Sequence, residues 1–127
     1  MIDSRISPHT DWLRLAEPLA LDSGQTLPDV RIAYRSWGQL SAAGDNAVLV
    51  CHALTGSADA DVWWAPLFGP GRTLDPSRDF IVCANALGSC YGSTGPASPA
   101  PDGQRWGARF PDVTIRDQVR LQMRLAD

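Results

Sequence analysis

The chain has 127 residues, a formal net charge of −3 and a hydrophobic content of 44%. This length suits one domain at most, and the composition is ordinary for a globular protein. The negative charge argues against non-specific binding to nucleic acid or to an anionic membrane surface.

The cysteines and the first residues bear on where the protein works. The thiols are Cys51, Cys83 and Cys90, and the first two fall inside apolar runs. This pattern favours buried, reduced cysteines over a disulfide framework, and it has no zinc-ligand spacing. Residues 1–8 lack the apolar centre of a signal peptide, and no apolar run approaches the roughly 18 residues of a membrane span. We therefore expect a cytoplasmic protein.

The first half of the chain predicts strands after an irregular lead-in over residues 1–15. Residues 18–21 form a short strand that is closed by a turn. Residues 30–37 alternate in the manner of a half-exposed strand, and we expect them to pair with 18–21 as an antiparallel edge hairpin. One face of that strand carries Arg31, Ala33, Arg35 and Trp37. Residues 46–51 form an apolar run of the kind that is buried on both faces of a sheet.

The second half predicts long loops around one more strand and a helix. A loop over 57–78 has room for a short helical turn at 61–67, and residues 80–84 predict a second buried strand. A Gly- and Pro-rich loop over 85–111 leads to a helix at 114–127, with Thr114 as N-cap and Asp117 in the capping-box position. This order fits the beginning of a mostly parallel α/β sheet. The helix has no stop signal at its end, so we expect the natural chain to continue.

The helix surface has a predicted apolar stripe and a basic row. The stripe contains Ile115, Val119, Gln122 and Ala126, flanked by Leu121 and Leu125. The row contains Arg116, Arg120 and Arg124. We interpret the row as a solvated face; a phosphate site is the alternative.

The junction after residues 46–51 is the strongest candidate for a ligand site. The apolar run ends in His52-Ala53-Leu54-Thr55-Gly56, a small turn at the carboxyl end of a buried strand. In open α/β sheets, ligands bind at the carboxyl ends of the strands.

Several common site signatures are absent from the sequence. It has no GxxxxGK[ST] loop, and its glycines after residue 84 do not match GxGxxG. Asp59 and Asp61 form a DxD pair, but no second carboxylate cluster supports a metal, so we expect no metal site. No serine has the GxSxG context, so the nucleophile elbow of an α/β-hydrolase is not within these residues.

Two features near the junction have competing interpretations. His52 could be a general base, but no nucleophile or orienting carboxylate is evident nearby, and a ring that ties loops together is the simpler interpretation. Trp63 and Trp64 could stack on a flat ligand, although an anchor for the long loop is the favoured interpretation.

The motifs taken together resemble one family. The strings occur in order at residues 46–56, 63–64, 69–71, 85–96 and 110–117. They closely resemble the N-terminal portion of the homoserine O-acetyltransferase family, and the resemblance covers residues 15–127. It implies that residues 1–127 form one partial domain: the N-terminal part of an α/β-hydrolase fold, truncated before the nucleophile elbow.

The resemblance also implies a mechanism and a set of site residues. Members of this family acetylate L-homoserine from acetyl-CoA in methionine biosynthesis, by ping-pong transfer through an acyl-serine activated by a histidine and an aspartate. That triad lies outside this sequence. The backbone N–H of Leu54 is implied as an oxyanion-hole donor, and the segment His52, Ala53, Leu54 and Thr55 is implied to line the substrate pocket.

Alternatives remain for the donor, the acceptor and the class of protein. Close relatives use succinyl-CoA, or serine in place of homoserine, and the absent nucleophile also fits a non-catalytic α/β module. The family implies acyl-CoA as co-substrate with no bound cofactor, and a homodimer for the full-length protein. We expect residues 1–127 alone to be inactive as an acyltransferase.

Overall fold

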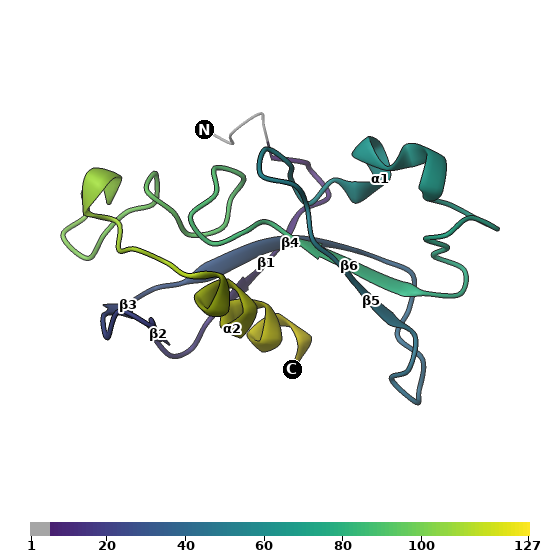
Figure 1. Ribbon diagram of the computed structural model, residues 1–127, viewed down its shortest axis with the longest axis horizontal. Coiled ribbons are helices and arrows are strands. Elements are labelled where there is room, and N and C mark those ends of the chain that lie inside the picture. The colour runs from purple at the N-terminus through teal and green to yellow at the C-terminus, as the bar shows by residue number, and fades with distance from the viewer. Residues whose placement is uncertain (1–5) are drawn as a thin grey trace. The chain divides into compact units, whose positions relative to one another are not determined.

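The computed structural model describes residues 6–127 (Figure 1). The chain divides into two compact units. The first contains residues 6–11 and Tyr34–Ala84, and the second contains Trp12–Ala33 and Asn85–Asp127.

Six strands and four short or medium helices make up this part of the chain. The strands are β1 (Asp11–Arg14), β2 (Leu19–Ala20), β3 (Thr26–Leu27), β4 (Arg31–Trp37), β5 (Ala47–Val50) and β6 (Phe80–Ala84). The helices are α1 (Ala60–Trp63), η1 (Ala65–Leu67), η2 (Gly107–Arg109) and α2 (Ile115–Ala126). One sheet has the order β1-β4-β6-β5, and β2 pairs with β3 in a separate two-stranded sheet.

In the first unit, β6 lies between an antiparallel and a parallel neighbour. β4 pairs antiparallel with β6, with Trp37 opposite Ile81, and β5 pairs parallel with β6, with Val50 opposite Cys83 (Figure 1). The parallel pair needs a crossover, which residues 51–79 supply with α1 and η1. Because β5 and β6 are parallel, their carboxyl ends lie at the same edge of the sheet.

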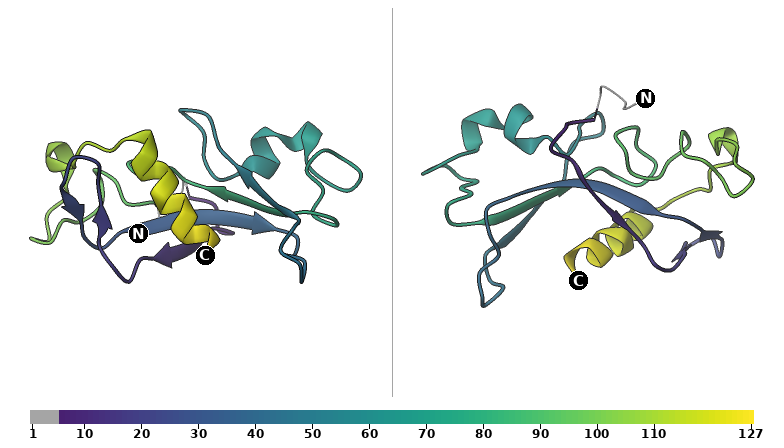
Figure 2. Two further views of the ribbon diagram at one scale, coloured as in Figure 1. Left: turned by 60° about the horizontal axis from the view of Figure 1, so that its bottom comes forward. Right: turned by 180° about the vertical axis from the view of Figure 1, so that it is seen from behind.

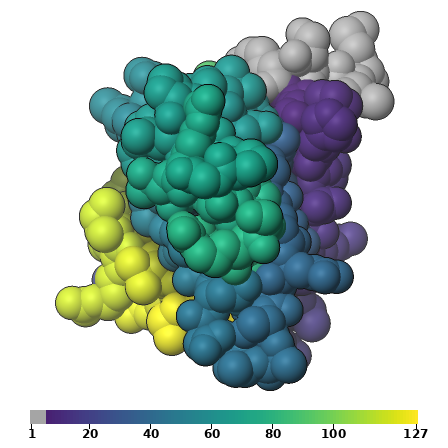
Figure 3. Space-filling model, turned by 90° about the vertical axis from the view of Figure 1, so that its right-hand side faces the viewer, coloured from purple at the N-terminus to yellow at the C-terminus, as the bar shows by residue number. Residues whose placement is uncertain are grey.

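The core of the first unit forms beneath this crossover. Its buried members are Val50, Ala58, Ala60, Leu74, Ile81 and Cys83. Partly buried Trp37, Val48, Trp63 and Phe68 pack against them. Figure 3 faces the α1 and η1 side of this unit, in teal.

The predicted strands at 46–51 and 80–84 both form, with different burial. Ile81, Cys83 and Ala84 of β6 are buried, as predicted. For β5 the prediction of burial on both faces is wrong, because Leu49 is 52% exposed. β5 has a neighbouring strand on one side only within the described sheet, and Ala47 and Leu49, which share one face, are exposed.

The predicted edge hairpin between 18–21 and 30–37 is wrong. β2 instead pairs with β3, Leu19 opposite Leu27, because the turn at residues 21–25 folds the chain straight back on itself. β4 pairs with β1, which lies within the segment predicted as irregular. Residues 1–5 of that segment lie outside the described part. Ala33 and Arg35 are buried, and the crossover residues Asp59 and Asp61 lie against the Arg35 guanidinium, so the prediction of a half-exposed strand is also wrong there.

In the second unit, α2 begins as the sequence predicts. The Thr114 side chain accepts a hydrogen bond from the Asp117 N–H, and the Asp117 side chain accepts one from the Thr114 N–H, so the capping box is complete. Asp117 is fully buried, and its other oxygen accepts from the Asp22 N–H at 2.9 Å. One carboxylate thus joins the helix start to the β2–β3 turn; Figure 2 shows α2 beside this hairpin.

The predicted apolar stripe of α2 is wrong in its position. Ile115 is 81% exposed, whereas Asp117 and Leu121 are buried. The helix therefore packs through the face that carries Asp117 and Leu121, and the hydrogen bonds of Asp117 at the N-cap fix which face this is. On the basic row, Arg120 is not merely solvated, since its guanidinium lies 2.7 Å from Asp22 and 2.9 Å from Asp117.

Replacing Asp117 tests this network. We expect Asp117→Ala to lower the free energy of unfolding of the full-length gene product by about 2–3 kcal/mol, because the Asp117 half of the capping box is lost and the Thr114 and Asp22 N–H groups lose their acceptor. Chemical denaturation at pH 7 measures this. Asp112→Ala, which removes an exposed carboxylate from the same segment, serves as the control and should change little.

The difference in free energy of unfolding between wild type and Asp117→Ala should depend on pH, because the Asp117 carboxylate titrates. Burial works to raise the pKa of Asp117, but hydrogen bonds from Thr114 and Asp22 and the charge of Arg120 outweigh it, so the pKa is lowered. A carboxylate with a lowered pKa stabilises the fold at pH values above its ordinary pKa of about 3.9. This stabilisation is lost as the pH falls through the pKa of the folded state. The gap between wild type and Asp117→Ala should therefore narrow in acid; a constant gap would contradict this origin.

Among residues 6–127, no helix is both long and apolar enough to cross a bilayer.

The cysteines are free, with Cys83 buried but Cys51 and Cys90 exposed. The prediction of a buried Cys51 is wrong because β5 ends at Val50 and Cys51 already belongs to the junction.

Candidate active-site turn

The junction that the sequence singles out is a tight turn directly after β5. The chain leaves the sheet at Val50, which is buried, and reaches α1 at Ala60, which is also buried. Between them, the Gly56 N–H donates to the Ala53 carbonyl at 2.8 Å and closes a β-turn over residues 53–56, called the 53–56 turn below.

Leu54 occupies the second position of the 53–56 turn. Its side chain is 100% exposed, so it makes no packing contribution within residues 6–127. The hydrogen bond that closes the turn joins Gly56 to Ala53 and does not engage the Leu54 N–H. A backbone N–H on a fixed, exposed turn is the kind of group that stabilises a developing oxyanion.

His52 is tied to the same turn. Its Nδ1 lies 2.8 Å from the Ala53 carbonyl oxygen. A carbonyl oxygen only accepts, so this contact is a hydrogen bond when Nδ1 carries the proton. The ring then braces the backbone next to Leu54.

Gly56 is needed where the turn closes. A Cβ built at this position would lie 3.0 Å from the His52 Cβ and 3.1 Å from the Ala53 carbonyl oxygen. These approaches are tight, so a larger residue would push against the two residues that precede Leu54. The small residue at 56 therefore keeps the 53–56 turn compact.

The segment that follows the turn is anchored by charge. Arg35 of β4 is only 7% exposed, and its Nη1 lies 2.8 Å from Asp59 and 2.6 Å from Asp61. Burial works to lower the pKa of Arg35, but hydrogen bonds to the two carboxylates outweigh it and raise the pKa. The DxD pair of the sequence thus binds a guanidinium, and residues 6–127 hold no group of three His, Cys, Asp or Glu side chains suited to a metal ion.

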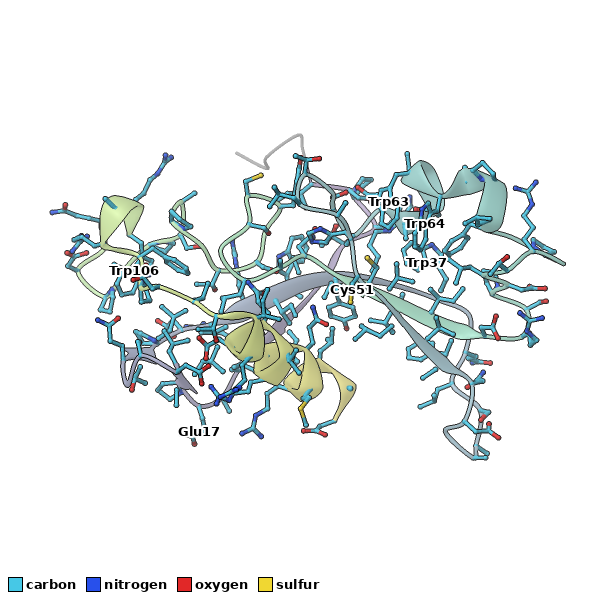
Figure 4. The ribbon with its side chains drawn as sticks, in the orientation of Figure 1. Glu17, Trp37, Cys51, Trp63, Trp64 and Trp106 are labelled. Carbon is cyan, nitrogen blue, oxygen red and sulfur yellow. The ribbon has the colours of Figure 1, made fainter. Side chains whose placement is uncertain are left out.

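Two tryptophans add contacts to this anchor. The Trp63 indole N–H donates to the Ser57 carbonyl at 3.0 Å, and Trp63 packs against the core, as an anchor should. Trp64 lies against it with ring centroids 4.8 Å apart and is 41% exposed (Figure 4). Burial raises the pKa of the Cys83 thiol to about 12, with Cys51 and Asp59 adding to the effect, so this thiol stays neutral.

In the second unit, hydrogen bonds between side chains and backbone hold the loop after β6. The Ser93 hydroxyl donates to the Asn85 carbonyl at 2.6 Å and accepts from the Ala33 N–H at 2.9 Å. The Asn85 amide donates to the Tyr91 carbonyl at 2.9 Å. These contacts fix the backbone of the loop over residues 85–93.

Sequence reasoning missed Arg35, which it placed on the face of a half-exposed strand. A cation in an otherwise apolar strand, with a DxD pair following the next strand, is the signal that could have drawn attention to it. The pairing itself is not visible in the sequence, because the partners lie 24 and 26 positions away.

Homoserine O-acetyltransferases are among the curated proteins that are similar to the chain. No protein-family model matches it. A homoserine O-acetyltransferase of Chloroherpeton thalassium is 62% identical over 120 residues, which are 94% of this chain and 32% of that protein. Further relatives of the same name share 60% and 53% identity, and the chain spans about a third of the length of the curated relatives it matches.

Solved structures agree on the fold. A homoserine O-acetyltransferase from Bacillus anthracis matches with a TM-score of 0.83 and 27% identity, over 91% of this chain and 35% of that one. Esterase E22 matches with a TM-score of 0.81 and 27% identity, over 91% of this chain and 36% of that one. In sequence the chain is similar to about a third of the length of homoserine O-acetyltransferases, and its fold matches the corresponding part of the α/β-hydrolase fold of the two solved structures.

Proposed function

We propose that this chain forms the N-terminal part of a homoserine O-acetyltransferase, as part of a single α/β-hydrolase domain. In this proposal, the Leu54 N–H donates one hydrogen bond to the oxyanion, and His52, Ala53, Leu54 and Thr55 line the acceptor pocket. The observation that carries the proposal is the 53–56 turn, which presents Leu54 at the carboxyl end of β5 without using its N–H to close the turn.

The chemistry asked of this turn is simple. A serine outside residues 1–127 attacks the thioester carbon of acetyl-CoA, the C–S bond breaks, and the CoA thiol leaves with a proton. The homoserine hydroxyl then attacks the acyl-serine, the serine C–O bond breaks, and the serine regains its proton. Each attack places negative charge on the same carbonyl oxygen, and a preorganised N–H stabilises that charge by about 2.7–4 kcal/mol.

The surroundings of the turn fit this task. The Arg35 anchor, the Trp63 hydrogen bond and the His52 contact each hold backbone on one side of Leu54. A donor that is fixed before the reaction needs no reorganisation when charge develops. We further propose that the full-length protein is a cytoplasmic homodimer that uses acetyl-CoA as co-substrate in methionine biosynthesis.

A test is to follow CoA release by the full-length gene product with acetyl-CoA and L-homoserine. We expect turnover that depends on homoserine, faster than with succinyl-CoA or with L-serine. If succinyl-CoA were the better donor, the acyl group in the proposal would be wrong. The absence of turnover with any of these pairs would reject the proposal.

Ester hydrolysis is the second candidate function, since esterase E22 matches the fold as well as the Bacillus anthracis acetyltransferase does. The same oxyanion donor would serve both reactions, with water replacing homoserine as the second attacking group. Two releases can be followed: CoA from acetyl-CoA, and p-nitrophenol from p-nitrophenyl acetate. If either proceeds at the same rate with and without homoserine, hydrolysis is favoured over transfer.

A further inference from the structure

Arg35 is a deeply buried charged side chain near the 53–56 turn, and it takes no part in the bond changes of the proposed reaction. It projects from β4, and its guanidinium carbon lies 4.6 Å from the centroid of the Trp37 ring. Its side chain is 9% exposed, while those of Asp59 and Asp61 are 24% and 31% exposed. A buried guanidinium of this kind is retained only with good partners.

The partners bind it from two positions of one segment. Asp61 binds the guanidinium in a bidentate manner: Nη1 donates to Oδ1 at 2.6 Å and Nη2 donates to Oδ2 at 3.0 Å. Asp59 accepts a further hydrogen bond from Nη1 at 2.8 Å. The planar guanidinium suits this geometry, whereas a lysine ammonium has no fork and cannot reproduce it.

The contact continues towards the turn through Ser57. The Ser57 hydroxyl donates to the second oxygen of Asp59 at 3.1 Å and accepts from the Asp59 N–H at 3.3 Å. Ala58 and Ala60, on either side of Asp59, are buried in the core. Ser57 follows Gly56 directly, so the restraint ends one residue from the end of the 53–56 turn.

From this chain of contacts we infer that Arg35 is a positioning residue, which holds the 53–56 turn in place through Asp59, Asp61 and Ser57. The inference deepens the proposed function and rests on it, since the group being positioned is the Leu54 N–H. Without the guanidinium, Asp59 and Asp61 lose the positive charge that both of them bind, and the segment that follows the turn loses its link to β4.

The test compares Arg35→Met, Arg35→Lys and Asp61→Asn with Arg14→Met in the full-length gene product. Arg14 pairs with Asp29 on the surface, with side chains 71% and 73% exposed, so it is a matched arginine without burial. The burst of CoA release counts active sites, and steady-state turnover is then expressed per active site. Hydrogen exchange of peptides that cover residues 52–58 reports on the turn directly.

We expect Arg35→Met to lower kcat per active site by about 10- to 100-fold with KM values nearly unchanged, as displacement of a catalytic group does. The kcat values of Arg35→Lys and Asp61→Asn should lie between those of Arg35→Met and wild type. Amides of residues 52–58 should exchange faster in the Arg35 variants and at the wild-type rate in Arg14→Met.

Other outcomes separate the inference from the proposed function. Fewer active sites or a lower Tm, with wild-type kcat per site and unchanged exchange at 52–58, would overturn the positioning role and leave the acetyltransferase proposal intact. A wild-type protein without turnover would reject the acetyltransferase proposal instead. In that case the exchange rates alone decide whether Arg35 holds the turn.

Discussion

Replacing Leu54 with proline in the full-length gene product should lower kcat for acetyl transfer by about 100- to 1,000-fold, the usual cost of one lost oxyanion donor. Proline has no backbone N–H, so the substitution deletes the donor that the proposal assigns to the oxyanion. A side-chain substitution cannot make this test, because the proposed donor belongs to the backbone.

The turn itself should tolerate the substitution. Leu54 is the second residue of the 53–56 turn, the position at which proline is favoured in common β-turns. Its side chain is fully exposed, so no packing within residues 6–127 is lost. The N–H that closes the turn belongs to Gly56 and is retained.

Leu54→Ala provides the matched control, since it shortens the side chain and keeps the N–H. We expect it to retain kcat within a few-fold of wild type, with any further change confined to the KM for homoserine, because the Leu54 side chain belongs to the proposed acceptor pocket. Rates per active site, with KM for both substrates and a thermal melt, separate a lost donor from a damaged fold. Equal loss in the alanine and proline variants would show that the side chain matters and the N–H does not.

The features that could be predicted from the sequence are those that depend on neighbours in the chain. The Thr114 and Asp117 cap needs only residues three positions apart, and it forms as predicted. The run at 80–84 is apolar enough to be a strand in any sheet, and β6 occupies it. The helical turns at 60–67 likewise follow from local signals between breakers.

The features that could not be predicted depend on which distant segments meet. Residues 18–21 could pair with several strands, and the turn at 21–25 decides in favour of β3. β1 has no periodicity of its own and becomes a strand because β4 offers it an edge. The burial of Arg35 depends on carboxylates that reach it only once the crossover has folded.

The candidate site divides in the same way. The sequence singled out residues 52–56 as a junction that could bind a ligand, and the resemblance supplied the role of Leu54, which stays a prediction. What the structure adds is the means of holding that residue: a hydrogen-bonded turn, a braced His52 and a buried ion-pair anchor. An oxyanion donor is a backbone group, so the side chains that matter most to it are those that fix the backbone.

Gly38 provides the strongest expected effect on stability. It follows β4 directly and has φ +77°, in the left-handed region that favours glycine. A Cβ at this position would overlap the Asp79 carbonyl oxygen and lie 2.7 Å from the Pro76 carbonyl oxygen. Both carbonyls belong to the turn that leads into β6, so neither can move without disturbing the pairing of Trp37 with Ile81.

We expect Gly38→Ala to lower the free energy of unfolding of the full-length gene product by about 2–5 kcal/mol, because left-handed strain and a backbone clash act together. Gly44→Ala is the matched control in the same unit: its φ is +68°, but a Cβ there meets nothing within 4 Å. It should cost only the strain, about 1–2 kcal/mol. Chemical denaturation of both variants measures the difference, which isolates the clash with the β6 turn. Equal losses would mean that this turn yields freely, and the close approach of Gly38 would then have no role in holding β4 against β6.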